Sequence, residues 1–191
     1  MTITRCPWPS DNELMIAYHD TEWGAPLHDD RKHFEFIVLD LFQAGLSWST
    51  ILNKRENFRK AFDDFEPEKV ALYTARKVAK LMGDAGIVRN RMKIAATITN
   101  ARAFQIIQSE FGSFEKYIWR FVDGVPRQNR RRTLKQIPAK TALSDAMSKD
   151  LKSRGFAFVG STICYAYMQA AGMVNDHMVN CFRYAEIEDL T

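Results

Sequence analysis

Residues 34–52, FEFIVLDLFQAGLSWSTIL, decide the fold that we expect. Apolar residues recur there at three- and four-residue spacing as far as Phe42, which predicts a helix with most of its surface against a core. Asp40 falls inside this apolar pattern. Gly45 fits the end of the helix, and Ser47 can cap a second helix whose first turn holds Trp48. Leu46 is left at the tip of the turn.

This helix junction is where we predict the functional site. A buried acid (Asp40), an exposed apolar residue (Leu46) and a large aromatic (Trp48) at one junction suit a pocket for a flat polar ligand. The alternative is that Asp40 is a hydrogen-bonded core residue and that Trp48 is ordinary core filling. The pattern alone leaves both readings open, because functional sites are where local rules are expected to break.

The length and composition indicate a folded protein of ordinary size. A chain of 191 residues can form one sizeable core, or two small lobes that share a cleft. Its three cysteines, an odd number, and the absence of an N-terminal apolar run predict a reduced, cytoplasmic protein. No stretch is apolar for the roughly 20 residues that a membrane span requires.

Basic residues are concentrated in one segment. The net charge is only +4, but residues 124–144, the basic segment, contain six basic residues and no acid. The segment also lacks periodicity, so we expect it to be exposed. Smaller basic clusters lie at 89–93 and 149–154. One cluster alone is usually a solvated face, whereas several together favour a polyanionic partner.

The rest of the chain predicts further helices. Capping residues and apolar spacing place them at about residues 13–23, 47–62, 67–72, 74–82, 89–111, 113–121, 142–154 and 161–171. No segment alternates convincingly with period two, and nothing repeats at a fixed period. We therefore predict an all-α protein.

The connection at residues 154–162 is a candidate phosphate site. Gly155 and Gly160 bound a short apolar turn between two predicted helices. Such a hairpin can direct backbone N–H groups, together with those of the following helix, at a phosphate. Glycine-bounded helical hairpins are also common packing devices. The neighbouring Lys152 and Arg154 favour the phosphate reading.

A second candidate site divides between the chain ends. Cys6 and His19 lie near the start, and His177 and Cys181 lie four residues apart near the finish. Two thiolates and two imidazoles match tetrahedral zinc. The spacing of the first pair is not diagnostic, however, and isolated cysteine and histidine residues are more often unliganded.

The remaining candidates are read as ordinary residues. Cys164 lies on an apolar helix and is expected in the core. His28 and His33 have no evident partner and are expected at the surface. The P-loop, the dinucleotide fingerprint and a Ser-His-Asp order are missing, which argues against a nucleotide cofactor and against hydride transfer.

With these residues assembled, the chain resembles the DNA-3-methyladenine glycosylase I family over nearly its whole length. The matching strings are AYHD (17–20), EWG (22–24), QAGLSW (43–48), DAGI (84–87), GFAFVG (155–160) and NDH (175–177). The resemblance implies a helix-hairpin-helix DNA glycosylase fold of two helical lobes around a cleft, with residues 1–191 as one unit and the hairpin at about 142–172. It also implies a structural zinc that ties the chain ends together through Cys6, His19, His177 and Cys181.

The activity implied by the resemblance is hydrolytic release of 3-methyladenine from double-stranded DNA. The damaged nucleotide would be flipped out of the duplex. No lysine stands where it could attack the sugar, so we expect a monofunctional enzyme, and we expect it to be a monomer. The alternatives are a non-catalytic helix-hairpin-helix module that binds damaged DNA, and a glycosylase with shifted alkylpurine specificity.

The resemblance also implies roles for particular residues. Tyr18, Asp40 and Trp48 would bind the base, with Asp40 as the catalytic group, and Leu46 would wedge into the duplex. The DNA-binding set is completed by Gly155, Phe158 and Gly160. The sequence departs from the family at Asp40, where a glutamate is usual, and at Leu41, where a small residue is usual. This departure bears on base preference. Asp176 is left without a role.

Overall fold

The computed structural model describes residues 3–190 and consists mainly of α-helices. They are α1 (Glu13–Thr21), α2 (Asp30–Gln43), α3 (Trp48–Ala61), α4 (Pro67–Val70), α5 (Ala75–Gly83), α6 (Arg91–Phe111), α7 (Phe114–Ile118), α8 (Ala142–Ser153), α9 (Ser161–Ala170) and α10 (Phe182–Glu188). Short 3-10 turns follow α3 and α7, and another lies in the basic segment. The prediction of an all-α protein is confirmed, apart from one pair of two-residue strands.

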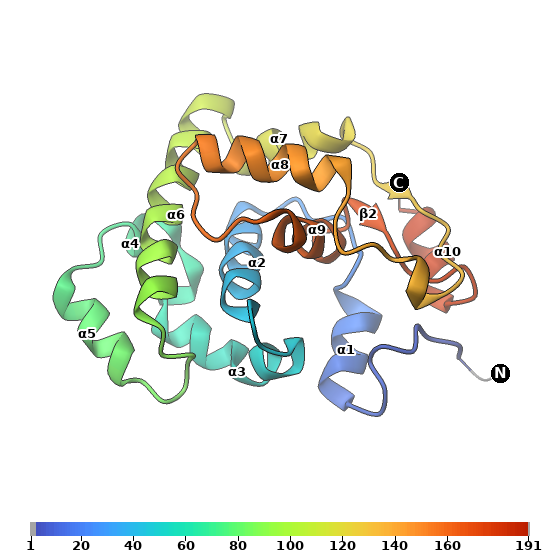
Figure 1. Ribbon diagram of the computed structural model, residues 1–191, viewed down its shortest axis with the longest axis horizontal. Coiled ribbons are helices and arrows are strands. Elements are labelled where there is room, and N and C mark those ends of the chain that lie inside the picture. The colour runs from blue at the N-terminus through green and yellow to red at the C-terminus, as the bar shows by residue number, and fades with distance from the viewer. Residues whose placement is uncertain (1–2, 191) are drawn as a thin grey trace.

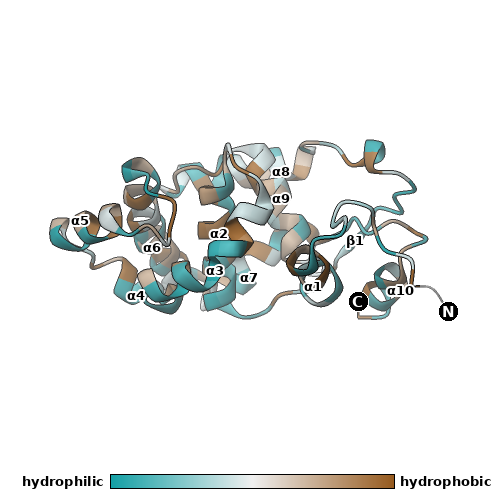
Figure 2. Ribbon diagram, turned by 90° about the horizontal axis from the view of Figure 1, so that it is seen from below, coloured by the Kyte–Doolittle hydropathy of each residue, from teal (hydrophilic) through white to brown (hydrophobic). Residues whose placement is uncertain are grey.

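Helix α2 is the centre of the molecule (Figure 1). Every residue from 33 to 42 is buried, so the helix is enclosed on all sides rather than amphipathic. It contacts α3, α6, α7 and α9. Asp29 caps its start by accepting a hydrogen bond from the Lys32 N–H at 2.8 Å. Figure 2 shows apolar residues on α2 and on the helices around it.

The other helices lie toward the two ends of an elongated molecule. Helices α4, α5 and α6 form one end, and α1, α10 and both chain termini lie at the other (Figures 1 and 2). Helices α8 and α9 pack against each other, and α9 also packs on α2. The hairpin predicted near 142–172 therefore lies directly beside the central helix. No helix among the described residues is both long and apolar enough to span a membrane.

One helix and one pair of strands were not predicted from the sequence. Helix α10 is only seven residues long, too short for a clear apolar period. Strands β1 (Arg127–Gln128) and β2 (Val174–Asn175) pair in parallel, with Arg127 opposite Val174. Two residues cannot display an alternation, and the pairing joins positions 47 residues apart. Tertiary packing therefore decided both elements.

Two predictions about surface residues were wrong. His33 is fully buried and its Nδ1 lies 2.6 Å from the Tyr167 hydroxyl. Burial lowers the pKa of His33 to about 4, so the ring is neutral near pH 7. Lys93, counted in a basic cluster, is also buried. Its ammonium donates to the carbonyls of Phe42 at 2.9 Å and Ala44 at 2.6 Å, and so caps the C-terminus of α2.

Candidate active site and metal cluster

A cavity of about 370 Å³ opens where α1, α2, α3 and α9 meet. Three of the residues predicted to bind a base, Tyr18, Asp40 and Trp48, all line it. Because α2 ends just after Asp40 and α3 begins at Trp48, the helix junction brings the acid and the aromatic to one wall. The full lining is Trp8, Met15, Tyr18, Trp23, Asp40, Gln43, Trp48, Leu134, Ile137, Ala166, Gln169 and Ala170.

Aromatic rings form much of this cavity. The ring centroids of Tyr18 and Trp48 are 5.3 Å apart, and those of Trp8 and Trp23 are 5.1 Å apart. Trp8 also meets Tyr18 edge to face at 6.4 Å. The sequence analysis missed Trp8 and Trp23 as lining residues. Trp23 lies in a string that carried the resemblance, whereas no local signal marks Trp8. A flat ring that enters the cavity would meet several aromatic faces.

Asp40 is the acid of the cavity, and its environment is unusual. The side chain is 3% exposed, and Oδ2 is buried without a hydrogen-bond partner among the described residues. Burial raises the pKa of Asp40 well above its ordinary value, because the charged form loses its hydration. The indole Nε1 atoms of Trp8 and Trp48 are also buried without a partner. Unsatisfied buried polar atoms are rare, and all three of these belong to residues that line one cavity, which suits a polar ligand.

The departure at Leu41 does not alter this cavity directly. Leu41 is 1% exposed, belongs to the core, and is absent from the lining. One turn of helix beyond Asp40, Gly45 has φ +81° and turns the chain. Leu46, which follows, is 40% exposed. Lys93 fixes the start of this turn by holding the carbonyls of Phe42 and Ala44. An apolar side chain is thus presented to solvent from a braced loop.

The hairpin between α8 and α9 presents free backbone donors. The N–H of Ala157 donates to Asn100 Oδ1 at 2.7 Å, and the Ser148 hydroxyl donates to the Val159 carbonyl at 2.6 Å, so the turn is anchored to α6 and α8. Within the described chain, the N–H groups of Phe158, Val159 and Gly160 have no acceptor. Phe158 has φ 57°, an uncommon conformation that is found at ligand-binding turns. This geometry suits an anion.

The basic segment is less detached than predicted. Residues 127–128 pair with β2, and Leu134 and Ile137 form part of the cavity wall. Arg131 pairs with buried Asp176 at 3.2 Å, whereas Arg132 and Lys135 are exposed as predicted. A cationic surface therefore borders the cavity. Near the hairpin, Lys152 is exposed, but Arg154 is paired with Glu110 and Asp150.

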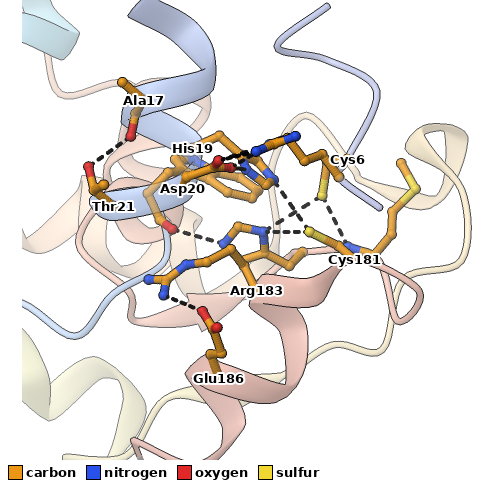
Figure 3. A network of polar contacts seen from close by, with 12 residues as sticks. Cys6, Ala17, His19, Asp20, Thr21, Cys181, Arg183 and Glu186 are labelled. Carbon is orange, nitrogen blue, oxygen red and sulfur yellow. Dashed lines mark hydrogen bonds and ion pairs between the residues drawn. The ribbon is translucent and has the colours of Figure 1, made fainter. Parts of the chain in front are cut away.

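The four predicted metal ligands come together in one buried cluster (Figure 3). The ligand atoms of Cys6, His19, His177 and Cys181 all lie within 4.8 Å of one another. Cys181 Sγ lies 3.5 Å from His19 Nε2 and 3.7 Å from His177 Nδ1, and Cys6 Sγ lies 3.7 Å from His177 Nδ1. Tetrahedral zinc with bonds of about 2.0 to 2.3 Å requires sulfur-to-nitrogen distances of roughly 3.5 Å. The donor set and its size therefore fit a metal ion.

The outer nitrogens of the two imidazoles are already engaged. His19 Nδ1 lies 2.7 Å from Asp20 Oδ1, and His177 Nε2 lies 2.9 Å from the Trp23 carbonyl. Both outer nitrogens carry the proton because their partners only accept, so the inner nitrogens are free to bind a metal. Between the sulfurs, a hydrogen bond from Cys6 lowers the pKa of Cys181 and raises that of Cys6. The lowered pKa favours the thiolate form of Cys181, which is the form that binds a metal.

The structure also places Cys164, His28 and Asp176. Cys164 is buried in the core as expected, with Sγ 3.5 Å from the Val159 carbonyl. His28 is largely exposed and contacts Glu115. Asp176 is 1% exposed and its carboxylate accepts four hydrogen bonds from neighbouring side chains. It lies beside the cavity but does not line it.

Residues 8–184 match the family model of methyladenine glycosylase. DNA-3-methyladenine glycosylase 1 of Escherichia coli is 52% identical over 180 residues, which cover 94% of this chain and 96% of that protein. DNA-3-methyladenine glycosylase of Haemophilus influenzae is 46% identical over 178 residues, covering 93% and 96%.

Solved structures agree with this assignment. A crystal structure of 3-methyladenine DNA glycosylase I superposes with a TM-score of 0.91 at 50% identity and covers 94% of this chain and 98% of that one. The enzyme from Staphylococcus aureus, solved to explain its recognition of 3-methyladenine, gives 0.91 at 35% identity, with 95% and 97% covered. The aromatic cavity, the Cys/His cluster and these matches together establish that the chain belongs to the methyladenine glycosylase family.

Proposed function

We propose that this protein is a DNA glycosylase that releases 3-methyladenine from alkylated DNA. One observation carries the proposal: a buried acid with an unpaired oxygen lies in an aromatic cavity that is large enough for a purine. Trp48 and Tyr18 would hold the base by stacking, at roughly 1–3 kcal/mol per stacked base. Asp40 would accept a hydrogen bond from the amino group of the base.

The chemistry needs few catalytic groups. Methylation at N3 makes the attached base cationic, so it departs as a neutral molecule when the bond to the sugar breaks. Water then adds to the sugar carbon that held the base and loses a proton. No general acid is required on the leaving base. Asp40 is the catalytic group in this proposal, because its negative charge would help to bind the cationic base and would stabilise the positive charge that moves to the sugar as the bond breaks. A charge-assisted hydrogen bond contributes roughly 1.5–3 kcal/mol.

Burial raises the pKa of Asp40, so its ionised form needs a source of stabilisation. Burial alone favours the protonated form of Asp40, because the charged form loses its hydration. A cationic base supplies both an opposite charge and N–H donors, and each favours the ionised carboxylate. The site would therefore be charged when it holds the damaged base, and this selects a cation over a neutral purine.

Access to the base would come from the exposed turn and the hairpin. Leu46 would enter the duplex as a wedge, because it is apolar, exposed and mounted on a braced loop. The free N–H groups of Phe158 and Gly160 would hold a phosphate, and Gly155 permits the turn with φ +90°. Flipping a nucleotide costs a few kcal/mol, and less for a damaged base.

The metal would be a structural zinc. Four protein ligands complete a tetrahedral set and leave no position for a catalytic water. The ion would join the N-terminal segment before α1 to the turn before α10, at the end of the molecule where both termini lie. We further propose that the protein acts as a monomer in the cytoplasm, which is consistent with its three free, buried cysteines.

The decisive experiment is release of the free base from methylated duplex DNA. We expect 3-methyladenine to appear as free base while the DNA strand stays intact, because no lysine among residues 3–190 lines the cavity to attack the sugar. Binding of alkylated DNA without base release would support a damage-binding module instead. A comparison of 3-methyladenine, 3-methylguanine and 7-methylguanine release would define the specificity that Asp40 confers.

A further inference from the structure

Asp176, which has no part in the chemistry proposed above, fixes the orientation of a residue that lines the base cavity. Its Oδ1 accepts from Asn129 Nδ2 at 2.8 Å and from Arg131 Nε at 3.2 Å. Its Oδ2 accepts from the Tyr165 hydroxyl at 2.6 Å and from Gln169 Nε2 at 2.8 Å. All four partners donate, so the carboxylate is saturated and paired with a cation.

This arrangement determines which way the Gln169 amide faces. An ionised carboxylate has only acceptors, so Gln169 can meet Asp176 only with its NH₂ group. The amide oxygen Oε1 must then lie on the other side of the planar amide, and no donor on the described chain is bonded to it. Gln169 lines the same cavity as Asp40, Tyr18 and Trp48. Asp176 therefore fixes the orientation of a neutral amide at the cavity wall and leaves its oxygen free to accept.

We propose that Gln169 is a second specificity-determining residue, which accepts a hydrogen bond from the amino group of the flipped base. This rests on the proposed function. The amino group of an adenine-type base carries two hydrogens, so Asp40 and Gln169 can each accept one. A guanine-type base presents an oxygen at that position and would face two acceptors. Asp176 is the positioning residue that keeps the Gln169 oxygen, rather than its NH₂ group, toward the base.

The test uses the fact that a side-chain amide carries an acceptor oxygen on one side and a donor NH₂ group on the other. In Asp176→Asn, the donors Asn129 and Arg131 hold the new carbonyl oxygen, which turns the new NH₂ group toward Gln169. Gln169 must then rotate its own oxygen toward residue 176 and present NH₂ to the cavity. We expect the ratio of 3-methyladenine to 3-methylguanine released from methylated DNA to fall on the order of tenfold or more.

Gln169→Met provides an independent arm, because it removes both amide groups and leaves Asp176 in place. We expect about a tenfold loss of 3-methyladenine release and a smaller effect on 3-methylguanine. The matched control is Gln108→Met, since Gln108 Nε2 also donates to an aspartate, Asp30, at 2.8 Å but lies outside the cavity. Metal content and thermal melting report whether each variant is folded.

The outcomes separate this inference from the proposed function. The role of Gln169 would be overturned if the ratio of 3-methyladenine to 3-methylguanine released were the same in all three folded variants, Asp176→Asn, Gln169→Met and Gln108→Met. If Asp176→Asn failed to fold, Gln169→Met alone would decide between a changed and an unchanged ratio. A parent protein that releases no 3-methyladenine would refute the proposed function. The relative affinity for free 3-methyladenine and free 3-methylguanine would still test Gln169.

Discussion

The imidazole of His177 is hydrogen-bonded to the wall of the base cavity, with Nε2 2.9 Å from the Trp23 carbonyl oxygen. The two rings also meet edge to face, with centroids 4.6 Å apart. Gly24, which has φ +82°, allows this approach, because a Cβ there would lie 3.0 Å from the His177 ring. The metal cluster and the cavity therefore share a contact through Trp23.

Loss of a metal ligand should reduce stability first. We expect Cys181→Ala to lose the metal and to lower the melting temperature on the order of 10 °C, because the proposed ion would join the two ends of the chain. Elemental analysis and thermal melting measure both effects. Cys164→Ala is the control, since that thiol lies in the core away from the cluster. Purified parent protein without zinc, or unchanged melting in Cys181→Ala, would refute a structural zinc.

The hairpin should bind DNA without regard to sequence. Gly160→Leu has space in the free protein, where a Cβ meets nothing within 4 Å, but its side chain would occupy the place of a phosphate. We expect weaker binding to every duplex alike, and a salt dependence with a slope of about −0.9 for each phosphate neutralised. Gly83→Leu is the control, as Gly83 also has open space but lies at the far end of α5. Equal affinities for the two variants would place the phosphate elsewhere.

Trp48 should carry much of the affinity for the free base. We expect Trp48→Ala to bind 3-methyladenine on the order of tenfold or more weakly, since stacking contributes roughly 1–3 kcal/mol. Trp48→Phe keeps an aromatic face and should recover part of the loss. Quenching of tryptophan fluorescence by the free base measures the affinity. A parent-like affinity in Trp48→Ala would mean that the base binds outside this cavity.

Asp40 should contribute to excision at the expense of stability. We expect Asp40→Asn to lose on the order of ten- to a hundredfold in 3-methyladenine release, because a charge-assisted hydrogen bond is lost. Asp40→Glu restores the side chain that is usual in the family and should hold or raise activity, because Leu41 does not line the cavity. Parent-like release in Asp40→Asn would make Asp40 a core acid. A collapse in Asp40→Glu would mean that the surroundings are fitted to aspartate.

The raised pKa of Asp40 gives a prediction for stability against pH. The folded state binds this proton more tightly than the unfolded state, so stability is lost as pH rises from the unfolded value of about 4 through the folded pKa. Asp40→Asn lacks this loss. The free energy of unfolding of Asp40→Asn relative to the parent should therefore increase from acidic to neutral pH. A constant difference in denaturant melts across that range would show that the two states share one pKa.

The raised pKa of Asp40 also predicts how activity falls as the pH is lowered. Excision by the parent should fall as pH decreases through the raised pKa of Asp40, at a higher pH than an ordinary carboxyl group of pKa about 4 would give. Asp40→Asn should lack this fall. The measurement is kcat/KM for 3-methyladenine release across the acidic to neutral range. An identical fall in both proteins would assign it to another group.

Local sequence was sufficient for most of the helices. Apolar spacing and capping residues such as Asp29 and Ser47 act within one or two turns, so their consequences can be read in order along the chain. The same local reading placed Asp40 and Trp48 on either side of a helix junction. The chemistry of two thiolates and two imidazoles made Cys6, His19, His177 and Cys181 candidates, and the family resemblance selected them as one ligand set, although residues 6 and 181 lie far apart in sequence.

Only the tertiary structure decided the rest, because it depends on contacts between distant segments. Trp8, Leu134 and Gln169 reach the cavity from three separate parts of the chain, and nothing in their neighbouring residues indicates it. His33 and Lys93 have the polarity of surface residues, yet one meets Tyr167 and the other meets the end of α2. A buried polar group is stable only where a partner is supplied, and that partner is chosen by the packing of helices rather than by local sequence.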